Sequence, residues 1–301
     1  MKHKILIVED ESIAAESIKL ILENKGYNIC GIAASADEAL KQYKKQEPDL
    51  VLLDIKLDNN TTSFEIVNEI KKNGTPFIYL TAYNDSKIRL EAKKTEPYGF
   101  FIKPYLSREL ISCVEFAIYK SKNEIKQKRT NKMLSTLILL NKTLRNCTDT
   151  DNLFQKACDI LMKQNIFEKI YIAKYDIQKQ LALIASGGFK SNKNILQNML
   201  LKNKLPLCFS KSIKNKKVNI LDEENEGCFR CPLINEMNNN NIVLTKKIGY
   251  QNINYGIMGA WVSKKYFNLS DNKNNEDEIK FFSEIIETIA YKLHIANNKS
   301  K

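Results

Sequence analysis

The sequence predicts an α/β first half wound on both faces of a parallel sheet, then a long helix, then a second half of mixed α and β structure. Over the first 105 residues, strand-length apolar runs alternate with helical segments, which is the pattern of successive βα units. After Pro104 no Gly or Pro occurs until well beyond Asn146, and strand patterns return from Lys169. A chain of 301 residues is long enough for two domains with separate cores.

Four apolar runs in the first half end on polar or small residues. They are Ile5–Asp10, Leu50–Asp54, Phe77–Ala82 and Phe101–Pro104. Continuous apolar runs suit strands buried on both faces of a parallel sheet, whose carboxyl ends form the edge where ligands bind. At that edge we expect five side chains to converge: Glu9, Asp10, Asp54, Thr81 and Lys103.

These residue types favour phosphoryl transfer. Carboxylates at Glu9, Asp10 and Asp54 would repel one another, so a hard cation such as Mg2+ is their natural occupant. One carboxylate can then act as a nucleophile and become an aspartyl phosphate. Lys103 offers a positive charge and Thr81 a hydroxyl to the new phosphate. The alternative is that these residues are simply solvated strand ends. We consider this interpretation weaker, because four motifs occur in the right order.

In order and spacing, Glu9-Asp10, Asp54, Thr81-Ala82 and Lys103-Pro104 resemble the receiver domain of two-component response regulators. The resemblance covers about the first 120 residues and implies a flavodoxin-like fold with a five-stranded parallel sheet. It also implies that Asp54 accepts a phosphoryl group from a partner histidine kinase. By the same resemblance Glu9, Asp10, Asp54 and the backbone carbonyl of Lys56 hold Mg2+.

The chain departs from the receiver pattern at two places. Phe100 stands where Tyr is commoner, which keeps the aromatic ring of the conformational switch and makes its coupling to Thr81 steric. The loop Leu57–Ser63 lacks the glycines usual after the phosphoacceptor, which affects how the loop moves. Haloacid-dehalogenase-like phosphatases need an acid two residues after the nucleophile, and Lys56 excludes that class.

The segment from Leu106 to about Asn146 predicts one long helix or two closely joined helices. We expect a receiver at 1–120, a linker helix at 121–146 and a second domain at 147–301. Apolar residues follow the later part of the helix at alternating spacings of four and three: Met133, Leu137, Leu140 and Leu144. This seam suits the same helix of a second subunit or packing onto the next domain, and the pattern favours neither.

Positive charge is concentrated in the linker. The formal net charge is +12, and a basic stripe opposed only by Glu124 contains Lys120, Lys122, Lys126, Lys128, Arg129 and Lys132. Nucleic acid can bind such a stripe through its phosphates. A solvated helical linker is the simpler interpretation, and we favour it over nucleic-acid binding.

The second half predicts helices and strands in alternation. Thr148–Asp151 caps a helix, and a closing amphipathic helix runs from about Glu276 to Ala296. A third helical stretch near 194–201 precedes an irregular polar region that holds three cysteines. The strands are predicted at 170–175, 181–185, 242–245 and 257–262.

This order of elements, with Tyr255-Gly256-Ile257-Met258-Gly259 in a late strand, resembles a GAF domain over about 135–298. Cys228–Leu233 is similar to a stretch in some GAF domains of two-component proteins. The resemblance implies an α+β fold with an antiparallel sheet that binds a small ligand or dimerises, and it leaves the ligand unknown.

Seven cysteines carry no evident paired framework. Cys208, Cys228 and Cys231 are candidates for a metal or redox site, because thiolates at C-x-x-C spacing chelate metals or form disulfides. A fourth ligand would have to come from Cys147 or Cys158. The alternative, slightly favoured, is that the three cysteines are packed as small hydrophobic residues. Cys30 and Cys113 are expected in cores.

The function classes follow from these features. No apolar run approaches the ~20 residues of a membrane span, no signal peptide is evident, and the cysteines suit a reducing compartment, so we expect a cytoplasmic protein without membrane insertion. His3 and His294 fit no kinase motif, and we expect no enzyme. The main hypothesis is a response regulator with a GAF-like output, and a homodimer through the linker helix is one of its options. The alternative is a GAF-based ligand, metal or redox sensor that uses the receiver for docking.

Overall fold

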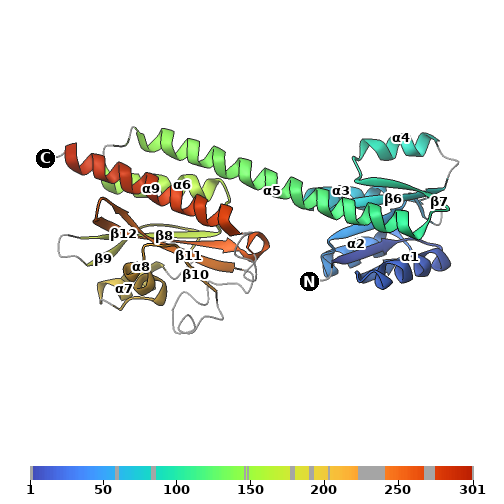
Figure 1. The fold of residues 1–301 in the computed structure, drawn as a ribbon, viewed down its shortest axis with the longest axis horizontal. Helices are drawn as coiled ribbons and strands as arrows, with labels where there is room; N and C mark the ends of the chain where they lie inside the picture. Colours follow the sequence, from blue (N-terminus) through green and yellow to red (C-terminus); the bar gives the residue numbers. More distant parts are fainter. Residues whose placement is uncertain are drawn as a thin grey trace. The chain divides into compact units, whose positions relative to one another are not determined.

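The computed structural model describes residues 3–57, 61–82, 86–145, 147, 149–176, 180–189, 193–202, 204–222, 241–267 and 275–299. The chain forms two compact units, Met1–Gln127 and Lys128–Lys301 (Figure 1). The division falls inside the predicted linker, and the boundaries expected at 120 and 146 stay predictions. Within the described ranges, no helix has the length and apolar character needed to cross a membrane.

A five-stranded parallel sheet forms the centre of the first unit, as the sequence predicted. Its strands are β1 (Lys4–Val8), β2 (Asn28–Ala33), β3 (Leu50–Asp54), β6 (Phe77–Ala82) and β7 (Gly99–Lys103). They lie in the order β2-β1-β3-β6-β7, and every neighbouring pair is parallel. The order reverses between β1 and β3, so the switch point lies beside the ends of these two strands.

Helices cover both faces of this sheet. They are α1 (Ser12–Asn24), α2 (Ala36–Gln46), α3 (Phe64–Asn73), α4 (Ser86–Lys94) and the first part of α5 (Ser107–Arg145). Alternate residues of the strands point to opposite faces, so Ile5 and Ile7 pack with α1 and α5, whereas Leu6 and Val8 pack with α2 and α3. The continuous apolar runs are therefore explained by burial on both sides.

Local caps follow the sequence signals. The Ser35 hydroxyl accepts a hydrogen bond from the Glu38 backbone N–H at 3.3 Å, as a capping box requires. The Glu38 carboxylate accepts from the backbone N–H of Ala34, at 3.0 Å, where the ideal box would use Ser35. After Asp54, β4 (Lys56–Leu57) and β5 (Thr61–Thr62) form a small antiparallel pair.

The second unit is built on an antiparallel five-stranded sheet in the order β10-β11-β12-β8-β9. The strands are β8 (Lys169–Tyr175), β9 (Leu181–Gly187), β10 (Asn219–Leu221), β11 (Asn241–Tyr250) and β12 (Ile253–Ser263). β11 begins one residue before the predicted 242–245 and ends five residues after it, because it pairs with β12 through a tight turn. Gln251 and Asn252 form that turn with positive φ angles, and β10 was not predicted.

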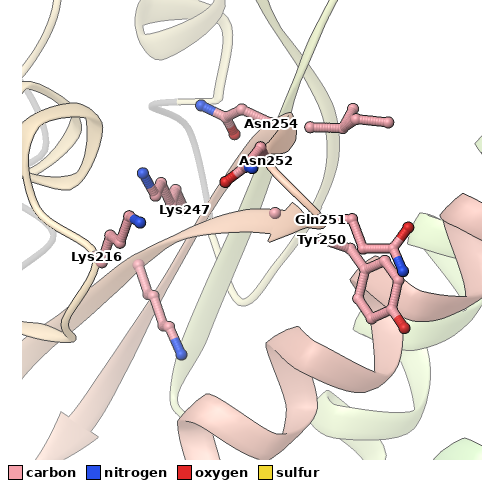
Figure 2. Close-up of a pocket in the computed structure, with 9 residues that line it drawn as sticks. Lys216, Lys247, Tyr250, Gln251, Asn252 and Asn254 are labelled. Carbon is pink, nitrogen blue, oxygen red and sulfur yellow. The ribbon is translucent and has the colours of Figure 1, made fainter.

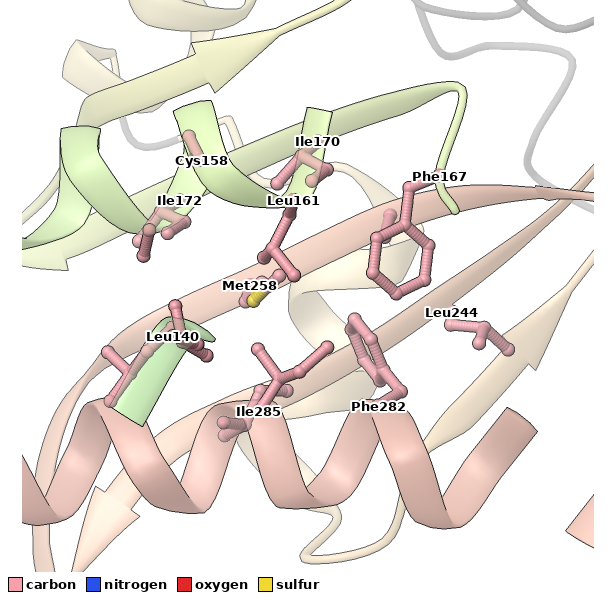
Figure 3. Packing of buried hydrophobic residues seen from close by; sticks show 14 of the residues in the cluster. Leu140, Cys158, Leu161, Phe167, Ile170, Ile172, Leu244, Met258, Phe282 and Ile285 are labelled. Carbon is pink, nitrogen blue, oxygen red and sulfur yellow. The ribbon is translucent and has the colours of Figure 1, made fainter. Parts of the chain in front are cut away.

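Two helical layers enclose this sheet (Figure 1). The later part of α5 packs on one face with α6 (Thr150–Lys163) and α9 (Glu276–Lys299), and α7 (Lys193–Leu201) and α8 (Leu207–Lys214) pack on the other. Figure 3 shows the first of these cores, where Leu140 of α5 faces Met258 of β12 and Ile285 of α9. Helix α8 corrects one expectation, because it occupies part of the predicted irregular region.

The predicted helix seam is used inside this core. Met133, Leu140 and Leu144 are buried in it, and Leu137 packs partly against it. The seam therefore packs onto the following domain, which was one of the two alternatives that the sequence left open. The buried side chains of Met133, Leu140 and Leu144 do not offer a surface for a partner helix, so a dimer contact on α5 would use its exposed residues.

One member of the predicted basic stripe, Arg129, is largely withdrawn from solvent, whereas Lys120, Lys122, Lys126 and Lys128 are exposed. The Arg129 side chain is only 9% exposed and is paired with Glu278 of α9, with Nε donating to Oε1 at 2.8 Å. Lys122 lies 3.0 Å from the His3 ring, and Lys120 lies 3.9 Å from Glu124. The sequence alone does not reveal the buried carboxylate partner of Arg129, so this residue looks like its lysine neighbours there.

Candidate functional site: a carboxylate and lysine cluster at the edge of the parallel sheet

Four parallel strands bring the predicted residues to one edge of the sheet. Glu9 and Asp10 directly follow β1, and Asp54 is the last residue of β3. In β6 and β7, Ala82 pairs in register with Lys103, which places Thr81 one residue before the level of Lys103. Since β1, β3, β6 and β7 are neighbours in the sheet, all these residues lie along its carboxyl edge.

Three carboxylates form a compact cluster. Glu9, Asp10 and Asp54 each offer an oxygen, and these oxygens lie within 4.8 Å of one another. Glu9 and Asp54 are buried, whereas Asp10 is half-buried. Burial, with a smaller contribution from the charge of Asp54, raises the pKa of Glu9 to about 7, although Lys103 opposes the shift. In the part of the chain that the structure describes, no other such group of metal-ligating side chains occurs.

Lys103 joins two of these carboxylates. Its Nζ donates to Asp54 Oδ2 at 2.5 Å and to the two Glu9 oxygens at 2.8 and 2.7 Å. Burial lowers the pKa of Lys103, but the hydrogen bonds to Asp54 and Glu9 and their charges more than offset it and raise the pKa. The ammonium therefore compensates the carboxylates, and it lies where it can meet a negative group attached to Asp54.

The donor set fits Mg2+, which prefers hard oxygen ligands and retains several waters. The Asp54 carboxylate is oriented by the Lys56 backbone N–H, which donates to Oδ1 at 3.1 Å. Asp10 is the most exposed of the three acids, so the cluster opens to solvent on its side. The backbone carbonyl of Lys56 belongs to the same residue as this N–H, and its role as a Mg2+ ligand stays a prediction.

The predicted switch residue lies against an aromatic cluster that the sequence did not reveal. Tyr79 and Phe100 are directly opposite in the β6–β7 register, and their rings stack at 5.5 Å between centroids. Tyr79 is fully buried, and its hydroxyl lies 3.2 Å from that of Thr95. Thr81, two residues along the same strand, is also buried. Side chains directly opposite each other on neighbouring strands interact, so the strand register would have been needed to predict the contact of Phe100 with Tyr79.

The predicted cysteine site is only partly within the described residues. Cys208 lies in α8, where the Tyr171 hydroxyl donates to its sulfur at 3.3 Å, whereas Cys228 and Cys231 lie outside the described residues. Cys158 is buried in the core on the opposite face of the sheet, and Cys147 packs against that core. Neither can therefore join Cys208 as a fourth ligand without refolding.

Cys30 and Cys113 meet the expectation of core positions. Each packs half-buried against a different face of the parallel sheet. Burial raises the pKa of both thiols, so neither is an activated nucleophile.

A hollow of ≈ 280 Å³ lies at the β11–β12 hairpin of the second unit (Figure 2). Lys216 and Lys247 point toward the same space, near Asn252 and Asn254, while Tyr250 lies on the other side of the strand. This hollow contains none of the residues predicted to carry function. Its lysine and amide side chains are of types that are common throughout this Lys- and Asn-rich chain, so the sequence did not predict this hollow.

Comparison with known proteins agrees with the geometry of the first unit. Residues 5–115 match the family model of the response regulator receiver domain. This segment of the chain is therefore a receiver domain, as its motifs indicated. The match covers the parallel sheet and the beginning of α5, and it does not extend to the second unit.

Similar proteins include a transcriptional regulatory protein, YdfI, of Bacillus subtilis, with 32% identity over 38% of this chain and 55% of that protein. The sensory transduction protein LytT of Bacillus anthracis is 30% identical over 42% of this chain and 51% of that protein. The chain thus spans about half the length of these relatives. A receiver domain structure from Desulfovibrio desulfuricans is 30% identical, with a TM-score of 0.39, over 41% of this chain and 99% of that one.

Proposed function

We propose that this chain is a two-component response regulator in which Asp54 accepts a phosphoryl group from a histidine kinase. The observation that carries the proposal is the buried Asp54 carboxylate, placed among Glu9, Asp10 and Lys103 at the edge of a receiver-type sheet. Two of the similar proteins are named as a regulatory and a sensory transduction protein, which supports a role in signalling.

The chemistry follows from the contacts of Asp54. One carboxylate oxygen attacks the phosphorus of a phosphohistidine, a P–O bond forms, and the P–N bond to the leaving imidazole breaks. The Lys56 N–H holds Oδ1 at 3.1 Å and so limits rotation of the nucleophile. Mg2+ held by Glu9, Asp10 and Asp54 would neutralise charge on the transferred group. Attack of water on the acyl phosphate would return Asp54 to its carboxylate.

Lys103 and Thr81 are proposed to bind the phosphoryl group on Asp54 and to respond to its presence. The Lys103 ammonium already contacts Asp54 Oδ2, so it needs only a small movement to reach a phosphoryl oxygen. Thr81 lies on the neighbouring strand, two residues from Tyr79, on which Phe100 stacks. Movement of Thr81 toward the phosphate would alter the packing around Phe100, which is a steric two-state switch.

The second unit is proposed to be a GAF-like output or sensory domain. Its antiparallel sheet with helices on both faces supports that assignment. The proposed output is contact with a partner or ligand rather than catalysis. A cysteine-based redox or metal sensor remains the alternative, to be tested by thiol titration of the reduced and mildly oxidised protein.

Incubation with acetyl phosphate and Mg2+ tests the main proposal. Intact-mass spectrometry should show one acid-labile phosphate on the wild type and none on Asp54→Asn. The matched control is Asp37→Asn, which changes an exposed acid on α2 and should be phosphorylated like the wild type. A phosphate on Asp54→Asn, or one that forms equally well without Mg2+, would refute the assignment.

A further inference from the structure

An apolar strip remains exposed on α5 after the predicted seam is buried. Leu134 is 54% exposed and Ile138 is 69% exposed, one helical turn apart on the same face. Both residues belong to the second unit, where the neighbouring side chains Met133 and Leu140 are buried in its core. Large apolar side chains clustered on a surface mark an interaction site more often than chance.

The strip borders a continuous groove. One hollow of ≈ 700 Å³ runs along α5 past Leu134, Leu137 and Ile138. A second, of ≈ 630 Å³, shares Leu137 and Asn141 with it and continues to Tyr250 of β11 and Tyr291 of α9. The rings of Tyr250 and Tyr291 meet edge to face at 5.5 Å, so aromatic rings form part of the far wall.

The two adjoining hollows carry charges of opposite sign, basic in the first and acidic in the second. Lys142 and Arg145 line the α5 side, and both are exposed. Glu284 and Glu287 line the α9 side, and Glu287 keeps 67% of its side chain exposed while pairing with Lys246. One surface thus carries an apolar floor, a basic rim and an acidic rim.

We propose that this groove is the interface between two copies of this chain, each placing the Leu134 and Ile138 strip of α5 into the groove of the other. A two-fold operation is self-complementary, so it brings the basic rim of each copy to the acidic rim of its partner twice. A second copy therefore places opposite charges against both the basic and the acidic rim. This contact is different from the buried seam and goes beyond the proposed phosphoryl transfer.

Light scattering of the full chain over a range of concentrations tests the proposal. The wild type should have twice the 34.7 kDa mass of one chain. Ile138→Glu should weaken the dimer roughly 10- to 100-fold, because it places a charge at the centre of the interface. The control is Ile195→Glu on α7, a 43% exposed residue on the other face of the sheet, and it should dimerise like the wild type.

A charge swap identifies the occupant of the groove. Lys142→Glu and Glu284→Lys should each weaken the dimer, and the double variant should restore most of it, because the rims meet between copies. A monomeric wild type, a dimer unaffected by Ile138→Glu, or a double variant no better than its parents would overturn the proposal. Phosphorylation of Asp54 in Ile138→Glu should be unchanged, so failure here is distinct from failure of the proposed function.

Discussion

Removing the Arg129 side chain should strongly destabilise the second unit. Arg129 Nε donates to Glu278 Oε1 at 2.8 Å, and Nη2 donates to Oε2 at 3.2 Å and to the Ile166 carbonyl at 3.1 Å. Its guanidinium also lies 3.9 Å from the centre of the Tyr266 ring. Arg129→Ala would remove these contacts and leave a carboxylate buried without its cation.

The expected magnitude follows from burial. The side chains of Arg129 and Glu278 are only 9% and 6% exposed, so solvent does little to replace the lost partner. Breaking a buried pair by removing one member costs about 3–5 kcal/mol. Replacing both members by apolar residues, as in Arg129→Met with Glu278→Leu, should cost much less, because no buried charge is left unpaired.

Urea unfolding monitored by tryptophan fluorescence measures this effect, since Trp261 is the only tryptophan and lies in the core of the second unit. The control Lys128→Ala, at an exposed neighbour on α5, should change the unfolding free energy by no more than about 0.5 kcal/mol. If Arg129→Ala lies within about 1 kcal/mol of the wild type, the ion pair does not anchor α5 as described.

The same pair predicts a pH dependence. Burial raises the pKa of Glu278, while the hydrogen bond and charge of Arg129 lower it. Without Arg129 the pKa should rise further, so the folded state gains protons relative to the unfolded state and loses stability as pH increases. The destabilisation by Arg129→Ala should therefore be larger at about pH 8 than at about pH 5. An equal loss at both values would contradict this reasoning.

Three further predictions concern single residues. Because the pKa of Glu9 is raised to about 7 and Mg2+ needs the carboxylate form, the apparent Mg2+ affinity measured by calorimetry should fall as pH drops below about 7, and a flat profile would be inconsistent with this. Asp10→Asn removes one of three carboxylates within 4.8 Å, so without Mg2+ it should raise the melting temperature, and added Mg2+ should then give less stabilisation than in the wild type. Gly259→Ala would place a Cβ 2.2 Å from the Tyr171 ring, so we expect a loss of about 1–3 kcal/mol in urea unfolding, and full stability would show that the sheet adapts.

The parallel sheet and the carboxylate cluster could be predicted because their signals are local. Asp54 and Lys103 each end an apolar run, and the ends of parallel strands must meet at one edge. The motif therefore specified the site without knowledge of any long-range contact. The stacking of Phe100 on Tyr79 depends on the register between two strands, which no short pattern states.

In the second unit the missing information was tertiary. The seam on α5 has the same spacing whether it meets a second subunit or its own domain, so burial of Leu140 and Leu144 had to come from the structure. Arg129 looked like its solvated lysine neighbours because its partner, Glu278, is 149 residues away. Helix α8 was missed because its eight residues are too few to show a clear periodicity.

Chemical trapping of the acyl phosphate shows directly whether Asp54 is the residue that is phosphorylated. The protein is phosphorylated with acetyl phosphate and Mg2+, reduced with borohydride, digested, and analysed by peptide mass spectrometry. An aspartyl phosphate is reduced to homoserine, so we expect homoserine at position 54 and an unmodified Asp10. Homoserine at position 10, or phosphate recovered on a serine, threonine or histidine while Asp54 stays unmodified, would contradict it.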